Sequence, residues 1–389
     1  MDISELFSTN VQRNYCGHCN GSLDLAFECF DEKVSGIRIR VTGLPTLRCH
    51  ACSATYLPDR SRVAVISLHK QAFEQASDLL EVTRRKTADT FAFTSVPFLY
   101  DSDDYYYIPG LQRQFDPGFL TPVFFRKEVL LKYDVHPSYQ VSFASRTYGT
   151  IWQGPEFSIP FGINRFDHVV MWLGDVAQLP ETEQYYLRSE NVQSDHSIGS
   201  EFYDGQIECI FTDKTSEDRL LEARSAFLDA CFKRFEMKVA HLDAEVLDLA
   251  LQIRRPVVDT SSERRSIADT LNKVYLESLD NKALEHILAG LKMDAGKLGS
   301  LKRLQKLIEA VSPGGNVASA MSPLYVLYDL RVVYSHLLSS EGQEQKLKTV
   351  HQRLGLPEGS DLFVTYDCLI EALAAAFNEL TVMVANPGR

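Results

Sequence analysis

Long apolar runs and an excess of positive charge are both missing from this 389-residue chain, and each absence excludes a class of protein. No apolar run approaches the roughly 18 to 20 residues that span a bilayer, so we expect no membrane segment. The opening MDISELFSTN lacks the basic and apolar regions of a signal peptide, and we therefore expect a cytoplasmic location. Lys and Arg number 40 against 52 Asp and Glu, and this net charge of −12 argues against non-specific coating of nucleic acid.

What the chain does contain is enough apolar sequence for two or three domains, with 45% hydrophobic and 24% charged residues. Residues 1–66 hold paired cysteines between strand-like runs. Residues 67–216 begin with a linker helix and continue as a segment rich in aromatics, Gly and Pro. Residues 217–389 repeat apolar side chains at helical spacing. The predicted fold class is multidomain α+β, with a cysteine-rich N-terminal domain, a β-rich α+β middle domain and a C-terminal all-α helical bundle.

The strongest motif is a matched set of cysteines, Cys16-Gly-His-Cys19 and Cys49-His-Ala-Cys52. Each C-x2-C turn places two thiolates on one side of a knuckle, and two such knuckles close a tetrahedral zinc site without an open position. In a reducing compartment, paired cysteines are more typical of metal ligands than of disulfides. The sequence therefore predicts one structural zinc ion in an N-terminal zinc ribbon. His18 or His50 could replace a cysteine, and the remaining four cysteines are expected to be buried thiols.

The segment around these knuckles resembles the YgiT-type (MqsA-like) zinc finger of bacterial antitoxins. The resemblance covers residues 14–60 and rests on the pair spacing and on the approach VTGLPTLRCHACSATYL, which begins at Val41. It implies a structural finger that can also bind a protein partner. No helix-turn-helix follows the finger, so the resemblance does not extend to a repressor.

The middle region offers no recognisable chemistry. Its strand-like runs are Val141–Tyr148 and Gln206–Phe211, and Arg62–Ile66 reads as another strand just before it. The acidic cluster of Asp101, Asp103 and Asp104 is expected to be a solvated loop rather than a metal site.

The C-terminal region is predicted to be helical from residue 217 onward, with a first helix reaching about residue 251 and N-cap residues at 259–263. The later helices are predicted at residues 264–279, 282–291, 297–311, 322–338, 342–355 and 361–384. Within the fourth of these lies Asp-Leu-Arg331-x4-His336-Leu. A histidine titrating near neutral pH can accept a proton from a ribose 2′-hydroxyl, and an arginine can hold the charge on a phosphate.

This R-x4-H pattern on a late helix resembles the HEPN ribonuclease motif. The resemblance implies a HEPN-like fold in which two copies of the helical domain meet as a homodimer and cut RNA without a metal, with Arg331 and His336 as catalytic residues. Similar spacings also occur at Arg13/His18, Arg62/His69 and Arg234/His241, as expected by chance for a short motif.

Two hypotheses follow. In the first, the chain is a bacterial toxin or phage-defence endoribonuclease with an RNA substrate, a structural zinc finger and a homodimeric helical domain. In the second, it is a non-catalytic antitoxin-like partner or sensor with a helical dimerisation domain. Val332 distinguishes them, because active members often carry a polar residue directly after the arginine. Lys297, Lys302, Arg303 and Lys306 form either a phosphate-binding face or an ordinary solvated face.

Overall fold

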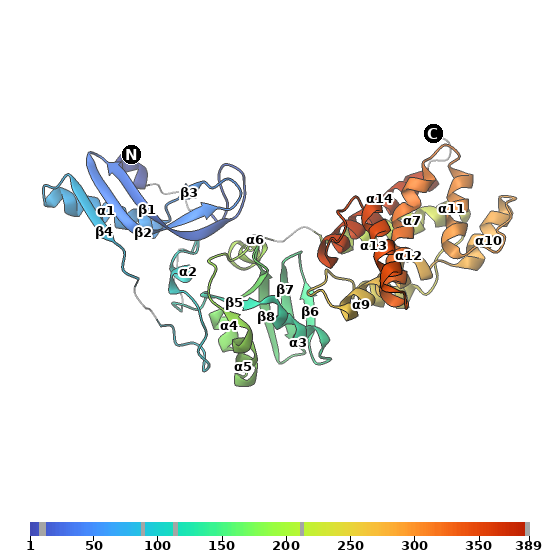
Figure 1. Ribbon diagram of the computed structural model, residues 1–389, viewed down its shortest axis with the longest axis horizontal. Helices are drawn as coiled ribbons and strands as arrows, with labels where there is room; N and C mark the ends of the chain where they lie inside the picture. Colours follow the sequence, from blue (N-terminus) through green and yellow to red (C-terminus); the bar gives the residue numbers. More distant parts are fainter. Residues whose placement is uncertain (8–12, 87–89, 112–115, 211–213, 386–389) are drawn as a thin grey trace. The chain divides into compact units, whose positions relative to one another are not determined.

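The computed structural model describes residues 1–389 except 8–12, 87–89, 112–115, 211–213 and 386–389. The chain divides into two compact units, Met1–Asp213 and Lys214–Arg389. The first unit contains the strands and several helices, and the second is built from helices (Figure 1). The expected mixed α+β class is confirmed at this level.

A long antiparallel hairpin organises the N-terminal part of the first unit (Figure 1). Strands β1 (Leu23–Val34) and β2 (Ile37–Cys49) are joined by Ser35 and Gly36, which both have the positive φ that tight hairpin turns require. Strand β3 (Thr55–Tyr56) pairs antiparallel with the end of β2, and β4 (Leu79–Thr83) pairs parallel with its first half.

Helix α1 (Asp59–Glu74) is the crossover between β2 and β4, because parallel neighbours need a long connection. It packs on the sheet around a small core that also contains the N-terminal 3-10 turn Ile3–Phe7. The predicted strand Arg62–Ile66 is wrong, since these residues lie inside α1. Short apolar runs do not distinguish strand from buried helix, and here Pro58 and Asp59 begin a helix. The predicted linker also contributes a strand, β4, to the N-terminal sheet.

The remainder of the first unit is a six-stranded antiparallel sheet in the order β10-β5-β9-β8-β7-β6. Its strands are β5 (Pro122–Arg126), β6 (Gln140–Phe143), β7 (Tyr148–Gln153), β8 (Phe157–Ile163), β9 (His168–Trp172) and β10 (Asn191–Val192). Its short helices are α2 (Ser102–Tyr106), α3 (Leu130–Val135, after the 3-10 turn Lys127–Val129), α4 (Leu173–Ala177), α5 (Glu181–Glu190) and α6 (Ser200–Tyr203).

Two predicted strands of this sheet differ from the observed elements. Val141–Tyr148 is not one strand, because the chain turns after β6 and returns as β7. The predicted strand Gln206–Phe211 is wrong over residues 206–208, since Asp204–Glu208 continues α6 as a π-helical turn, and Phe211 lies outside the described residues.

The second unit is helical, as predicted. Its elements are α7 (Ser216–Phe235), α8 (Asp243–Ala250), α9 (Ser261–Asn272, continued by the π-helical turn Lys273–Glu277), α10 (Asn281–Gly290), α11 (Ser300–Val311), α12 (Val317–Ser335), α13 (Ser340–Arg353) and α14 (Leu362–Ala385). Thr260 caps α9 as expected from the sequence. The first helix is shorter than predicted, because Glu236 adopts a left-handed conformation and ends α7.

Helix α14 packs against α7 and α12, and its buried face belongs to the core of this unit (Figure 1). By length and composition alone this helix could cross a membrane, but a single such helix is weak evidence for a membrane span, because the buried core helix of a bundle passes the same test. Its fully buried side chains, such as Leu369, Leu373 and Leu380, recur at helical spacing and belong to the unit's core. The central helix of a bundle has the same composition.

Candidate functional sites

The hairpin explains how cysteines thirty residues apart meet. Cys49 ends β2 and lies opposite Leu23, the first residue of β1, so the residues before β1 and after β2 share one end of the hairpin. A bridge between Tyr15 and Ser22 holds the first knuckle there. The sheet register therefore positions both C-x2-C turns.

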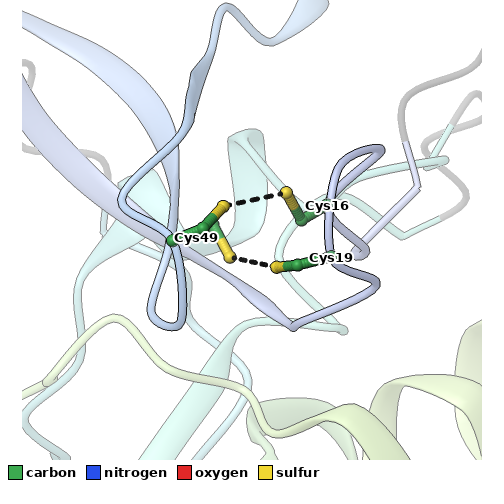
Figure 2. A group of neighbouring side chains, drawn as sticks. Cys16, Cys19 and Cys49 are labelled. Carbon is green, nitrogen blue, oxygen red and sulfur yellow. Dashed lines mark hydrogen bonds between the residues drawn. The ribbon is translucent and has the colours of Figure 1, made fainter.

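The four sulfurs of Cys16, Cys19, Cys49 and Cys52 all lie within 4.8 Å of one another. The Cys16–Cys52 and Cys19–Cys49 sulfur separations are both 3.5 Å, and Figure 2 shows the sulfurs converging from the two turns. An ion bound tetrahedrally at about 2.3 Å, the zinc–sulfur distance, would hold sulfurs about 3.8 Å apart. A Cβ on Gly21 would lie 3.2 Å from the Cys49 sulfur. The cluster therefore fits a four-thiolate metal site, and the glycine allows the backbone to approach it.

Both knuckles have the same backbone geometry. The N–H of Asn20 donates to the carbonyl of Cys16 (2.9 Å), and that of Ser53 donates to the carbonyl of Cys49 (3.1 Å). Asn20 and Ser53 each have a φ of 59°. Serine is less suited than asparagine to this left-handed conformation, but it occupies the equivalent position in the second turn.

Hydrogen bonds support the thiolate form at the first knuckle. The hydroxyl of Tyr56 lies 3.2 Å from the Cys16 sulfur, and this contact, together with the backbone N–H groups of the knuckle, lowers the pKa of Cys16 to about 6. At Cys19 the backbone N–H of Gly21 lowers the pKa, but the sulfurs of Cys49 and Cys52 raise it more, so the net shift is upward. The histidines of the knuckles lie outside the four-sulfur cluster: Nδ1 of His50 is 3.0 Å from the carbonyl of Ser22, and the His18 ring faces that of Tyr56.

The expectation that the other cysteines are buried is largely wrong. Cys231 is buried in the core of the second unit, but Cys29 and Cys209 are exposed and Cys368 is partly exposed. Cys29 lies at an irregularity in the β1–β2 register, which takes its side chain out of the regular alternation.

The second candidate site is the end of α12. Arg331 lies in its last turns, and His336 is its C-cap residue. Nη1 of Arg331 lies 3.5 Å from Nε2 of His336, and the histidine is exposed. Two carboxylates also approach Arg331, with Asp269 and Glu277 oxygens each 3.6 Å from its guanidinium. The two predicted residues are therefore brought together on the surface, in an environment that also contains negative charge.

In two of the competing Arg/His pairs the arginine has a partner other than the histidine. His69 lies on α1 with Arg62, which pairs instead with Asp59. Arg234 lies on α7 and donates to the carbonyl of Val384, whereas His241 follows that helix rather than lying within it.

The basic residues near α11 have structural partners. Arg303 pairs with Glu285 at 3.0 Å, and Lys306 donates to the carbonyl of Asp294. These contacts favour a packing role over a phosphate-binding face for both residues.

The acidic cluster in the middle of the chain is not a solvated loop, contrary to expectation. Asp101 caps α2, and Asp103 and Asp104 are both 4% exposed. Asp103 pairs with Arg84, while Asp104 contacts Nδ1 of His196 at 2.7 Å. No local sequence pattern indicates these partners, because they come from distant segments.

Ser194 completes this cluster without forming a hydrolytic triad. Its hydroxyl donates to Asp104 at 2.6 Å and lies 3.3 Å from Nδ1 of His196. A relay needs the serine and the carboxylate on opposite ring nitrogens, but here both face Nδ1. The arrangement is therefore a buried polar cluster rather than a nucleophilic site.

The His196–Asp104 pair predicts a pH-dependent stability. Burial lowers the pKa of His196, but the hydrogen bond and charge of Asp104 raise it more, so the net shift is upward. The pKa of His196 in the folded protein therefore lies above its unfolded value of about 6.5. The pair contributes fully to the free energy of unfolding below about pH 6.5, and this contribution is lost as the pH rises through the folded pKa. Burial also raises the pKa of Asp104, so the cost of desolvating its carboxylate offsets part of the pairing, and the His196 shift sets the pH window. Asp104→Asn should therefore lower the free energy of unfolding by about 2 kcal/mol near pH 6, and the difference from wild type should narrow near pH 9.

Urea unfolding of both proteins at the two pH values measures this effect. The matched control is Asp59→Asn, because the Asp59 side chain is 70% exposed. The control should change stability by less than about 1 kcal/mol. An Asp104→Asn effect that is equal or larger at the higher pH would contradict the assignment.

Comparisons with protein-family models, curated proteins and solved structures gave no match for this chain.

Proposed function

We propose that the four-cysteine cluster holds a structural zinc ion in a zinc ribbon. Four thiolates suit zinc, and a fully thiolate-bound ion has no position for a substrate. Because both knuckles close one end of the β1–β2 hairpin, the ion would stabilise the sheet rather than take part in a reaction.

We further propose that the chain is a metal-independent endoribonuclease of the bacterial toxin or phage-defence type, with its HEPN-like site at the end of α12. The observation that carries the proposal is the 3.5 Å approach of the Arg331 and His336 side chains on an exposed helix end. His336 would accept the proton of a ribose 2′-hydroxyl as its oxygen attacks the adjacent phosphorus. Arg331 would hold the charge that develops on the phosphate, and the 5′-oxygen of the next nucleotide would leave.

The proposal includes a homodimer that pairs two such sites. Leu337, directly after His336, is completely exposed, and Tyr328 on the same helix is 49% exposed. An exposed apolar side chain next to Arg331 and His336 supports the proposal that a second copy of the chain covers this surface.

Leu337→Asp is expected to weaken self-association at least tenfold, because it places a charge in an apolar contact. Sedimentation velocity across the micromolar range measures the change. Val382→Asp, at a residue that is 59% exposed on α14, is the control and should associate like wild type. A wild-type chain that stays monomeric throughout this range would contradict the dimer.

A second candidate is a non-catalytic antitoxin-like partner or sensor that binds proteins through its finger and dimerises through its helices. Asp269 and Glu277 favour it, because their ion pairs with Arg331 compete with a phosphate for the guanidinium. The apolar Val332 also favours it.

Incubation of the purified chain with RNA in the presence of a chelator tests the first proposal against the second. An endoribonuclease of this kind should produce internal cuts ending in 2′,3′-cyclic phosphates while its zinc remains bound. If RNA stays intact both in this assay and in infected cells that make the chain, the nuclease proposal is wrong and the non-catalytic interaction protein is the better account.

A further inference from the structure

The second unit contains a cavity between α7 and α8 that neither proposed site uses. Its volume is about 370 Å³, which lies within the usual range for small-molecule sites. One wall is a stripe of α7, and the facing wall is formed by residues 238–240 and α8. The apolar side chains lining it are Leu221, Leu228, Phe232, Val239, Val246 and Leu247.

A buried arginine lies in this apolar wall. Arg224 is only 8% exposed, although its neighbours Phe232 and Leu247 are about half exposed at the mouth of the cavity. Its Nη2 donates to the Ser278 hydroxyl at 3.0 Å, and that hydroxyl donates in turn to the carbonyl of Val274. A guanidinium has five N–H donors, and the Ser278 hydroxyl accepts from only one of its nitrogens.

No carboxylate forms an ion pair with Arg224 among the residues that the structure describes. Burial lowers the pKa of Arg224, and the nearby charges of Tyr275 and Asp243 offset this shift only in part. Arginine nevertheless remains protonated in proteins, and a buried cation without a counter-ion is costly. The cavity therefore presents a desolvated positive charge beside an apolar surface.

The charged side chains at the mouth of the cavity limit the negative charge of a ligand that could bind on Arg224. Asp229 and Asp243 line the cavity and are exposed, and Asp243 pairs with Lys238 at 2.6 Å. These carboxylates would repel a phosphate dianion. A single carboxylate matches the one unpaired guanidinium, to which it can bind through two parallel hydrogen bonds.

We propose that the α7–α8 cavity binds a small monocarboxylic acid with an apolar body, its carboxylate on Arg224 and its body against the leucines, valines and Phe232. The apolar body can be an alkyl chain or an aryl group. This site goes beyond the proposed nuclease, and its test does not depend on RNA cleavage.

Calorimetric titration of the full chain tests the site with decanoate, 4-phenylbutyrate, decan-1-ol and decyl phosphate. At least one of the two acids should bind wild type at least tenfold more tightly than decan-1-ol, because a hydrogen bond to a charged group contributes that much affinity. Decyl phosphate should bind more weakly than decanoate. The stronger of the two acids identifies the body as alkyl or aryl.

Two variants separate the guanidinium from the apolar wall. Arg224→Leu should abolish the preference for acid over alcohol, and its melting temperature shows whether it still folds. Leu247→Glu, at the exposed mouth, should weaken acid binding at least tenfold through charge repulsion. Leu251→Glu is the matched control, since Leu251 is 74% exposed and does not line the cavity. It should bind like wild type.

Three results would overturn the proposal. They are the absence of binding of either acid at millimolar concentration, equal affinity for decanoate and decan-1-ol, and equal binding by the Leu247→Glu and Leu251→Glu variants.

Discussion

Replacing Cys49 with serine is expected to release the metal from the N-terminal hairpin and to loosen the strands that end there. Wild-type protein should carry about one zinc ion per chain, and the variant should carry much less than that. Cys49 is both a predicted ligand and the last residue of β2, opposite Leu23. Metal binding to such sites contributes on the order of 10 kcal/mol, so its loss should exceed the effect of most single substitutions.

Elemental analysis and hydrogen exchange measure the two consequences. Exchange should accelerate in β1, β2 and β3, while the helices of the second unit keep their protection. Cys29→Ser is the control, since Cys29 is exposed and lies outside the four-sulfur cluster. A wild-type chain that contains no zinc and whose four thiols react freely would end the zinc proposal.

Replacing His336 with alanine is expected to abolish RNA cleavage under the conditions that trigger it. Loss of a general base lowers the rate by roughly 10²- to 10⁴-fold. Arg331→Ala should lower it nearly as much, because removing either of two residues that act in one step removes most of their joint effect. Both variants should still fold. His336 is exposed and Arg331 is not part of the apolar core of the second unit.

The assay compares RNA integrity in cells that make wild type, His336→Ala, Arg331→Ala or His241→Ala. His241 belongs to a chance Arg/His pair whose arginine, Arg234, donates to the carbonyl of Val384 instead, so its variant should cleave like wild type. The assay is run both with and without infection of the cells, because infection is the proposed trigger. If wild type and His336→Ala leave RNA in the same state, the nuclease proposal is wrong and the interaction protein takes its place.

Several features follow from the sequence because they depend on local chemistry. Helical spacing and the cap at Thr260 predicted most of the C-terminal helices, and the C-x2-C pairs predicted the four-cysteine cluster. In each case the residues that decide the outcome lie a few positions apart. Short apolar runs do not distinguish a strand from a helix, which is why Arg62–Ile66 and residues 206–208 are helical where the sequence predicts strands.

Other features depend on contacts between distant segments, and only the tertiary structure decided them. The hairpin register brings the two knuckles to one end of the sheet. Asp104 is buried because His196, ninety-two positions later, faces it. Arg224 lies in an apolar cavity because α8 folds back beside α7. A charged side chain in a sequence is expected to be solvated, and that expectation fails wherever folding supplies a partner or removes water from around the charge.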